Sequence, residues 1–331
     1  MAHEQAYADS RVLVTGGAGC IGSNLTRTLA GHGAARVVVL DDLSSAGRWN
    51  VPDHPAVHFV QGSVLDDEAL RGVFAEKPDY VFHLAALFAN QNSVDHPEQD
   101  LMVNGLGTLK VLQFAHLAGV RRFVYASSGC SVYGSAAPLP LREDFVSIDL
   151  DTPYQITKLL GELYGNFFFH YYKVPVVRTR FFNVYGPGEI PGRYRNVIPN
   201  FLYWALRKEP LPITGTGEET RDFTYVDDVI QGLLAAGAAD AAVGEAMNLA
   251  SGRETTVAHL AGLINELTGN PAGVRYVARR PWDNITRRCA SVEKAGRLLG
   301  YHPSTDFDTG VRRTWEWVTR HWDRLAQDAR F

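Results

Sequence analysis

Five short apolar runs recur through the first half of this chain, and longer segments of helical periodicity separate them. The runs lie at 11–15, 36–40, 57–60, 80–83 and 122–126. They lack the strict alternation of apolar and polar residues that marks a strand with one face in water, so both faces are expected to be covered. Strands of this kind that alternate with helices predict a doubly wound parallel α/β sheet with right-handed crossovers.

The segments between these runs carry the pattern of amphipathic helices. Ile21, Leu25 and Leu29 fall at i, i+4 and i+8, so one helix face there is apolar. We predict further helices at 66–75, 97–119 and 153–172, and a sixth strand at 174–182. After Asn183, glycine and proline become frequent over 186–192, and short strands and helices mix. The second half is therefore expected to form a smaller mixed α/β lobe.

Charge and cysteine content exclude several classes of protein. The 331 residues carry 32 Lys and Arg against 36 Asp and Glu, so a surface-wide nucleic-acid footprint is not expected. Cys20, Cys130 and Cys289 are too few and too far apart for a disulfide framework, which indicates a reducing compartment. No apolar run approaches the roughly 18 residues of a membrane span, and residues 1–10 lack a signal pattern. We therefore expect a cytoplasmic protein with no membrane partner.

Glycines at 16, 19 and 22 lie between the first predicted strand and the first predicted helix. They let the backbone approach a pyrophosphate, which binds the free N–H groups of the helix N-terminus. Asp41 ends the second strand, where its carboxylate can hydrogen-bond a ribose diol and repel a 2′-phosphate. The combination predicts a Rossmann-type domain that binds NAD rather than NADP. A plain strand–turn–helix with a surface aspartate is the alternative.

Tyr154 and Lys158 lie four residues apart in a predicted helix, so their side chains share one face. The ammonium of Lys158 can lower the pKa of the Tyr154 phenol, and a nicotinamide cation would add to that effect. A phenol with a lowered pKa can act as general base on a hydroxyl group while a hydride leaves the same carbon. The alternative is a pair of solvated residues on an exposed helix face.

Further motifs accompany this pair. They lie at 40–43, 83–86, 104–108, 125–134, 180–187, 220–223 and 280–283. Together with the glycine loop they make the chain similar, over nearly its whole length, to the extended short-chain dehydrogenase/reductases of the nucleotide-sugar epimerase/dehydratase group. These motifs are highly specific for that family and less specific for the reaction.

The resemblance implies a role for each matching residue. Tyr154, Lys158 and Ser128 would be the catalytic residues. The cofactor NAD would contact Gly16, Gly19, Cys20, Ile21, Gly22, Asp41, Asp42, Ser63, Val64, Leu84, Ala85, Ala86, Asn104, Tyr154, Lys158 and Phe181. The nucleotide sugar would contact Phe88, Ser128, Gly129, Cys130, Asn183, Asn196, Val197, Ile213, Arg221, Arg280 and Asp283. Arginines suit phosphates, although a surface salt bridge is the alternative for each arginine taken alone. No metal site is expected.

The chain departs from the family pattern at three positions. Members usually carry Ser or Thr three residues before the Val-Tyr-Gly of 132–134. Here that position is Gly129, so Ser128 becomes the candidate helper of the general base. Ser63 stands where members have Asp, which weakens an expected adenine contact, and Phe88 stands where epimerases often place Lys.

Several reactions share this machinery. A 4-epimerase needs the Tyr–Lys pair, a hydroxyl helper and room for a 4-keto sugar to rotate. A 4,6-dehydratase needs a further acid and base, which dehydratases place as Asp-Glu where this chain has Cys130 and Ser131. We therefore favour C4 epimerisation of a nucleotide sugar, most simply a UDP-hexose or UDP-uronic acid, over 4,6- or 5,6-dehydration and uronate decarboxylation. Arg193 or Arg195 could meet the carboxylate of a uronic acid, although a solvated basic loop is the favoured interpretation of these two residues. The Cys130 thiol could act as acid or base in dehydration if its pKa were tuned. An NAD-binding scaffold without turnover is disfavoured because the Tyr–Lys pair is intact.

The expected organisation has two parts. Residues 9–182 would form mainly the NAD-binding Rossmann domain and 183–331 mainly the nucleotide-sugar lobe, with segments near 220–250 returning to the sheet. The resemblance also implies a homodimer in which the helices predicted at 97–119 and 153–172 form a four-helix bundle with those of a second copy.

Overall fold

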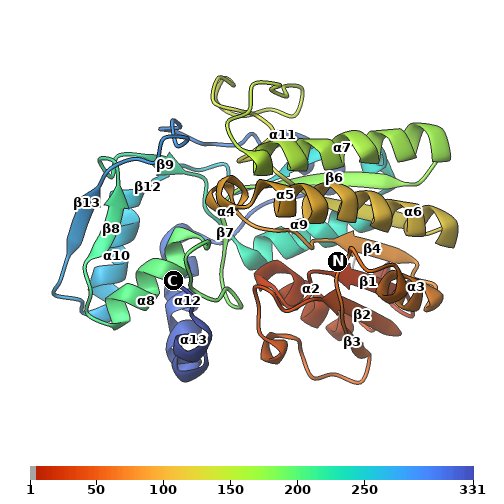
Figure 1. The fold of residues 1–331 in the computed structure, drawn as a ribbon, viewed down its shortest axis with the longest axis horizontal. Coiled ribbons are helices and arrows are strands. Elements are labelled where there is room, and N and C mark those ends of the chain that lie inside the picture. Colours follow the sequence, from red (N-terminus) through yellow and green to blue (C-terminus); the bar gives the residue numbers. More distant parts are fainter. Residues whose placement is uncertain (1–4) are drawn as a thin grey trace.

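A seven-stranded parallel sheet forms the larger body of the protein (Figure 1); the structure is a computed structural model and describes residues 5–331. Its strands are β1 (Arg11–Thr15), β2 (Arg36–Asp41), β3 (Val57–Gln61), β4 (Tyr80–His83), β5 (Arg122–Ser128), β6 (Val176–Phe181) and β11 (Ala246–Leu249). Their order is β11-β6-β5-β4-β1-β2-β3, which confirms the predicted Rossmann-type fold. The winding reverses between β1 and β4, and ligands of such sheets bind at the carboxyl ends of the strands near that point.

Helices cover both faces of this sheet. One face carries α2 (Cys20–Gly31), α9 (Val226–Ala238) and α11 (Glu293–Leu299), and the other carries α3 (Asp67–Ala75), α6 (Thr108–Ala118) and α7 (Pro153–Tyr172). The residues of β1 alternate between the two: Val12 and Val14 belong to the core under α2 and α9, and Leu13 to the core under α3 and α6. This alternation explains why the strand reads as an unbroken apolar run.

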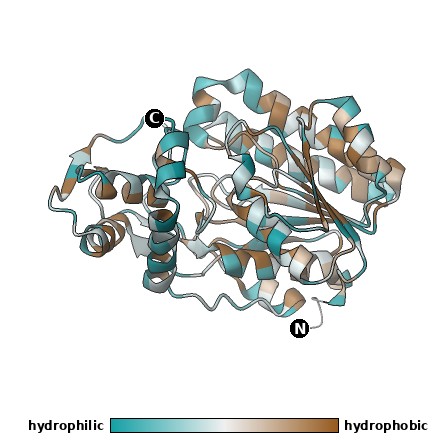
Figure 2. Ribbon diagram, turned by 90° about the horizontal axis from the view of Figure 1, so that it is seen from below, coloured by the Kyte–Doolittle hydropathy of each residue, from teal (hydrophilic) through white to brown (hydrophobic). Residues whose placement is uncertain are grey.

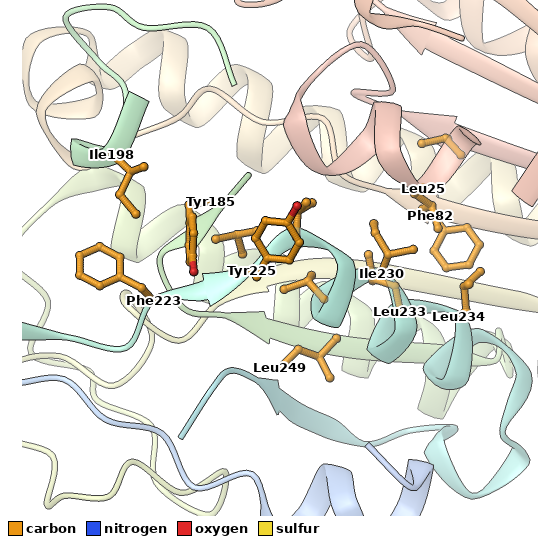
Figure 3. Packing of buried hydrophobic residues seen from close by; sticks show 14 of the residues in the cluster. Leu25, Phe82, Tyr185, Ile198, Phe223, Tyr225, Ile230, Leu233, Leu234 and Leu249 are labelled. Atoms are coloured by element: carbon orange, nitrogen blue, oxygen red, sulfur yellow. The ribbon is translucent and has the colours of Figure 1, made fainter. Parts of the chain in front are cut away.

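The first of these cores continues into the rest of the molecule. Figure 3 shows Leu25 of α2, Phe82 of β4 and Leu234 of α9 packed together, with Tyr185 and Phe223 farther along. Each fully buried leucine of this kind contributes about 1.5–3 kcal/mol relative to an exposed one. Hydrophobic residues lie along the central strands and inner helix faces, and hydrophilic residues on outer turns (Figure 2). The smaller part is therefore joined to the sheet by one continuous apolar core.

The predicted helix at 97–119 is three elements in the structure. They are α5 (Pro97–Asp100), the π-helical η2 (Leu101–Gly107) and α6. The helices predicted at 66–75 and 153–172 are confirmed as α3 and α7, and the strand predicted at 174–182 as β6. The apolar periodicity of 97–119 does not reveal the change in backbone hydrogen bonding within it.

The smaller lobe mixes short strands and helices, as expected. Its elements are α8 (Val197–Leu206), β8 (Leu211–Thr214), α10 (Val257–Thr268), β13 (Val274–Val277), α12 (Phe307–Arg320) and α13 (Trp322–Asp328). Two-residue strands pair nearby: β7 (Val184–Tyr185) with β10 (Thr224–Tyr225), and β9 (Thr220–Arg221) with β12 (Thr255–Thr256). Further helices in the part of the chain that the structure describes are α4 (Asn90–Asp95), η1 (Arg48–Asn50) and η3 (Asp240–Ala242).

The chain returns from this lobe to the large sheet. Helix α9 packs on β5 and β6, and β11 pairs with β6 at the sheet edge. These elements lie within the segment near 220–250 for which a return was expected, while the division at 182/183 remains a prediction. Within residues 5–331, no helix has both the length and the apolar character needed to cross a bilayer.

Candidate active site

One cleft of about 680 Å³ lies along the carboxyl ends of β1, β2, β4, β5 and β6, and the smaller lobe closes its other side. From the sheet, its wall includes Gly16, Asp41, Leu84, Ser128 and Phe181, and from the lobe Asn196, Arg221 and Arg280. The reversal of winding in the sheet therefore opens into a space that both parts of the chain line.

The glycine loop joins β1 to α2 at one end of the cleft. A Cβ at Gly22 would lie 2.2 Å from the carbonyl oxygen of Gly16, so only glycine permits this close approach of helix and loop. Gly19 caps α2 without a side-chain hydrogen bond, which leaves the first N–H groups of the helix available to a ligand. The loop and helix dipole together fit a pyrophosphate.

Asp41 lies at the end of β2 beside this loop. Its carboxylate accepts hydrogen bonds from the backbone N–H of Ala18 at 2.9 Å and of Leu43 at 2.8 Å. Burial raises the pKa of Asp41, and these two hydrogen bonds oppose that shift. The side chain is thus held in one orientation on the cleft wall, where its remaining lone pairs can accept from a diol.

Tyr154 lies in the first turn of α7. Ser93 Oγ accepts a hydrogen bond from the Tyr154 backbone N–H at 3.0 Å, and the Phe88 ring packs edge-on against the phenol at 5.9 Å between centroids. Lys158 lies one turn on, and its Nζ is 5.6 Å from the centre of the Tyr154 ring. The Nζ donates to the carbonyl of Ala126 at 2.9 Å. Both side chains line the same part of the cleft.

The predicted lowering of the Tyr154 pKa is not found in the protein itself. Burial raises the pKa of Tyr154 well above its ordinary value, and Asp100 and Cys130 add to the rise. Burial also lowers the pKa of Lys158 to about 8, against the attraction of Asp100. The expectation was wrong for the chain alone because desolvation of the phenol outweighs an ammonium that is bonded to Ala126. A cationic ligand group beside the phenol would act in the opposite direction.

Ser128 ends β5 and faces the same cleft. Its Oγ accepts a hydrogen bond from Ser131 Oγ at 2.9 Å. Gly129 follows and lies against the ring of Phe182, so its position is behind the wall rather than in it. A hydroxyl is therefore present at 128 and has no room at 129.

The smaller lobe contributes arginines to the cleft wall. Arg221 faces Asp283 at 3.5 Å, and the Arg280 guanidinium lies 5.6 Å from the centre of the Trp282 ring. On the wall of the same cleft, the Cys130 thiol donates to Asn183 Oδ1 at 3.3 Å. The cleft thus combines a phosphate-binding loop and a Tyr–Lys pair from the sheet with arginines from the smaller lobe.

The model of the NAD dependent epimerase/dehydratase family matches residues 12–250 of this chain. The chain belongs to this family. The UDP-glucose 4-epimerase of Mycolicibacterium smegmatis is 37% identical over 312 residues, which cover 92% of this chain and 97% of that protein. Among solved structures, epimerase Mth375 from Methanothermobacter thermautotrophicus is 59% identical, with a TM-score of 0.99 over 100% of this chain and 98% of its own. The Bordetella bronchiseptica enzyme WbmF, solved with NAD⁺ and UDP, is 40% identical, with a TM-score of 0.86 over 98% and 96% of the two chains.

Membership confirms the predicted family and NAD as its cofactor. The residues named for NAD and substrate remain proposals, and all but three of them line the cleft of this epimerase/dehydratase. Asn104 is buried behind the wall, where its amide accepts from the N–H and donates to the carbonyl of Leu87. Gly129 lies under Phe182, and Ile213 packs in the main core while Pro212 and Thr214 of the same strand face the cleft.

Glu189 and Arg288 are among the charged residues of the cleft that could not be identified from the sequence. Glu189 lies in the glycine- and proline-rich segment, and its Oε1 accepts from the Asn196 backbone N–H at 3.3 Å and side-chain amide at 2.9 Å. Burial raises the pKa of Glu189 to about 7 although the Arg195 charge opposes it. Arg288 lines the cleft from a segment after the last predicted substrate residue. Neither belongs to a periodic pattern or a spaced motif, so no sequence signal distinguished them.

Proposed function

We propose that this protein catalyses NAD-dependent epimerisation at C4 of a UDP-sugar. The observation that carries the proposal is the juxtaposition of Tyr154, Lys158 and Ser128 in one cleft that extends from the glycine loop to the arginines of the lobe. A sugar nucleotide that places its diphosphate on Arg221 and Arg280 would bring its sugar to Tyr154. The NAD and UDP complexes of the similar enzyme WbmF support this choice of ligands.

Tyr154, Ser128 and Lys158 have different roles in the proposed proton transfer. Tyr154 Oη takes the proton of the C4 hydroxyl as that carbon is oxidised, and returns it when the carbon is reduced. Ser128 Oγ orients the same hydroxyl. Lys158 holds the nicotinamide ribose and keeps positive charge near the phenol. NAD, when bound, supplies the hydride acceptor and donor.

The surroundings of Cys130 favour epimerisation over dehydration. No carboxylate occupies residues 128–131. The Cys130 thiol is engaged with Asn183, so loss of water from the sugar lacks a charged acid–base partner there. The test is to incubate the protein with UDP-glucose, UDP-N-acetylglucosamine and UDP-glucuronate and to follow products by NMR. A new C4 epimer would support the proposal, whereas loss of C6 or formation of a 4-keto-6-deoxy sugar would refute it.

We also propose a cytoplasmic homodimer formed through η2, α6 and α7. Leu163, Phe167 and Tyr171 lie one turn apart on α7 and expose 54%, 47% and 70% of their surfaces. Leu101 of η2 adds a further exposed apolar side chain. Such a patch is typical of an isologous contact. A monomer in sedimentation equilibrium at micromolar concentration would contradict the dimer. The variant Phe167→Glu, which places a charge in the apolar patch, should dissociate the dimer.

A further inference from the structure

Arg288 differs from the other deeply buried arginines of the chain in lacking a carboxylate partner. Arg180 is held by both carboxylate oxygens of Glu162 at 2.8 Å. Arg122 donates to Asp240 at 2.8 Å. Arg288 is only 4% exposed, yet within residues 5–331 it forms no ion pair, and its one hydrogen bond reaches the carbonyl of Gly134 at 3.5 Å.

The nearby carboxylates attract this guanidinium but form no ion pair with it. Asp283 faces Arg221 at 3.5 Å, and Asp151 lies near but makes no ion pair with Arg288. The positive charge of Arg221 repels it as well. Burial of an unpaired cation is costly unless another group compensates it. An arginine of this kind on the wall of a ligand cleft is suited to an anion that arrives with the ligand.

The position of Arg288 indicates which anion. It lines the cleft beside Cys130, and Cys130 is in turn close enough to Tyr154 to raise the pKa of the phenol. Arg288 therefore shares its part of the cleft with Cys130, which neighbours the phenol that receives the C4 hydroxyl, and with Arg221. The substituent of C5 is adjacent to C4 in a hexose. A carboxylate there would lie next to the reacting carbon, in the cleft whose wall Arg288 lines.

We infer that Arg288 binds the C5 carboxylate of the sugar, and that the preferred substrate is a UDP-uronic acid. The inference rests on the proposed function for the placement of C4 at Tyr154. A bidentate guanidinium–carboxylate contact is geometrically specific, so a neutral hydroxymethyl group at C5 cannot replace it. Arg288 would then determine specificity among UDP-sugars without taking part in proton transfer.

The test measures binding of UDP, UDP-glucose and UDP-glucuronate to the NAD-loaded protein by calorimetry. We expect UDP-glucuronate to bind at least tenfold more tightly than UDP-glucose. Arg288→Met should abolish this preference, with a loss of roughly 10- to 100-fold for UDP-glucuronate and less than threefold for UDP. Arg287→Met is the matched control, because Arg287 is exposed, is paired with Glu254 and lies outside the cleft wall.

Three results would overturn the inference. Equal affinity of the wild-type protein for UDP-glucose and UDP-glucuronate would remove its basis. An equal loss of UDP and UDP-glucuronate binding in Arg288→Met would assign the arginine to a phosphate. If Arg288→Met fails to fold, Arg288→Lys and Arg288→Gln are measured instead. An unchanged preference for UDP-glucuronate over UDP-glucose in both variants would again refute the carboxylate contact.

Product analysis separates this inference from the proposed function. Selective binding of UDP-glucuronate with loss of C6 as carbon dioxide would refute C4 epimerisation but leave the role of Arg288 intact. Epimerisation of UDP-glucose with no preference for the uronic acid would refute the role of Arg288 but leave C4 epimerisation intact.

Discussion

The aromatic ring of Phe182 occupies the space that a side chain at Gly129 would need. A Cβ at residue 129 would lie 1.9 Å from a carbon of that ring, which is fully buried. The relationship explains why the chain lacks the Ser or Thr that relatives are expected to carry at this position. It also moves the candidate hydroxyl to Ser128, one residue earlier on the end of β5.

Gly129→Ser should therefore destabilise the protein rather than restore a second hydroxyl. Overpacking of a filled core costs about 1–3 kcal/mol, measurable as a lowered midpoint in urea. The double variant Gly129→Ser with Phe182→Leu should recover part of that loss, since the two positions share one space. Gly262→Ala on α10 is the control: nothing lies within 4 Å of its added Cβ, and it should stabilise by up to about 1 kcal/mol. Additive effects of the 129 and 182 changes would contradict the steric explanation.

Asp41→Ala should weaken the binding of NAD and reduce the discrimination against NADP. The variant removes the acceptor proposed for the ribose diol and the charge that repels a 2′-phosphate. We expect NAD affinity to fall by roughly tenfold or more, with NADP nearly unchanged or improved. Fluorescence titration of the two cofactors measures this, and Asp53→Ala on an exposed loop is the control. Equal binding of NAD and NADP by the unmodified protein would rule the role out.

Glu189 should make the stability of the protein depend on pH. Its folded pKa of about 7 lies above the value of 4.5 expected for an exposed glutamate. The stability linked to its protonated form is present below about pH 4.5 and is lost as the pH rises through about 7. At pH 8 the charged side chain should therefore lower the free energy of unfolding by roughly 3 kcal/mol, since each unit between the folded and unfolded pKa corresponds to about 1.4 kcal/mol.

Glu189→Gln tests this directly. Oε1 can still accept from Asn196, and the buried Oε2, which has no partner among the described residues, is replaced by an uncharged amide. The variant should be more stable than the wild type at pH 8 and similar to it at pH 5, as judged by urea unfolding. Glu218→Gln on the exposed surface should show no such difference. If the free energies of unfolding of wild type and Glu189→Gln differed by the same amount at pH 5 and pH 8, Glu189 would have the same pKa in the folded and unfolded protein.

The sheet could be predicted from sequence because its information is local. Strands buried on both faces read as apolar runs, as Val12, Leu13 and Val14 show, and the glycine loop follows one of them directly. Glu189 and Arg288 could not be predicted, because their burial depends on contacts with residues distant in sequence. Arg288, for example, donates to the carbonyl of Gly134, which lies 154 residues earlier in the chain. Their roles follow from missing partners, which only a structure reveals.

The electrostatics of the Tyr154 phenol were likewise beyond the sequence. The spacing to Lys158 correctly placed the two side chains in one cleft. It could not show that the ammonium turns to the carbonyl of Ala126, or that Phe88 packs on the ring. Spacing determines which residues share a helix face, whereas solvation depends on everything that packs around that face.

Variants of the central residues should differ in a definite order. Tyr154→Phe keeps the ring against Phe88 but removes the oxygen that takes the proton, so kcat should fall by about a hundred- to ten-thousand-fold with NAD still bound. Lys158→Ala should lower kcat by a similar factor and should also weaken the binding of NAD. Ser128→Ala should cost less, because its hydroxyl only orients the substrate. Single-turnover rates and NAD retention measure both properties.

The matched control for this series is Tyr276→Phe, which removes a phenol oxygen from the exposed strand β13 and should leave turnover unchanged. Cys130→Ala distinguishes the two chemistries, because the thiol is the remaining candidate acid or base near Tyr154 on the cleft wall, whereas Asp100 lies outside that wall. In an epimerase this variant should retain most of its activity, since only the hydrogen bond to Asn183 is lost. Abolished turnover in Cys130→Ala together with a silent Ser128→Ala would make the thiol the proton donor or acceptor and would favour dehydration over epimerisation.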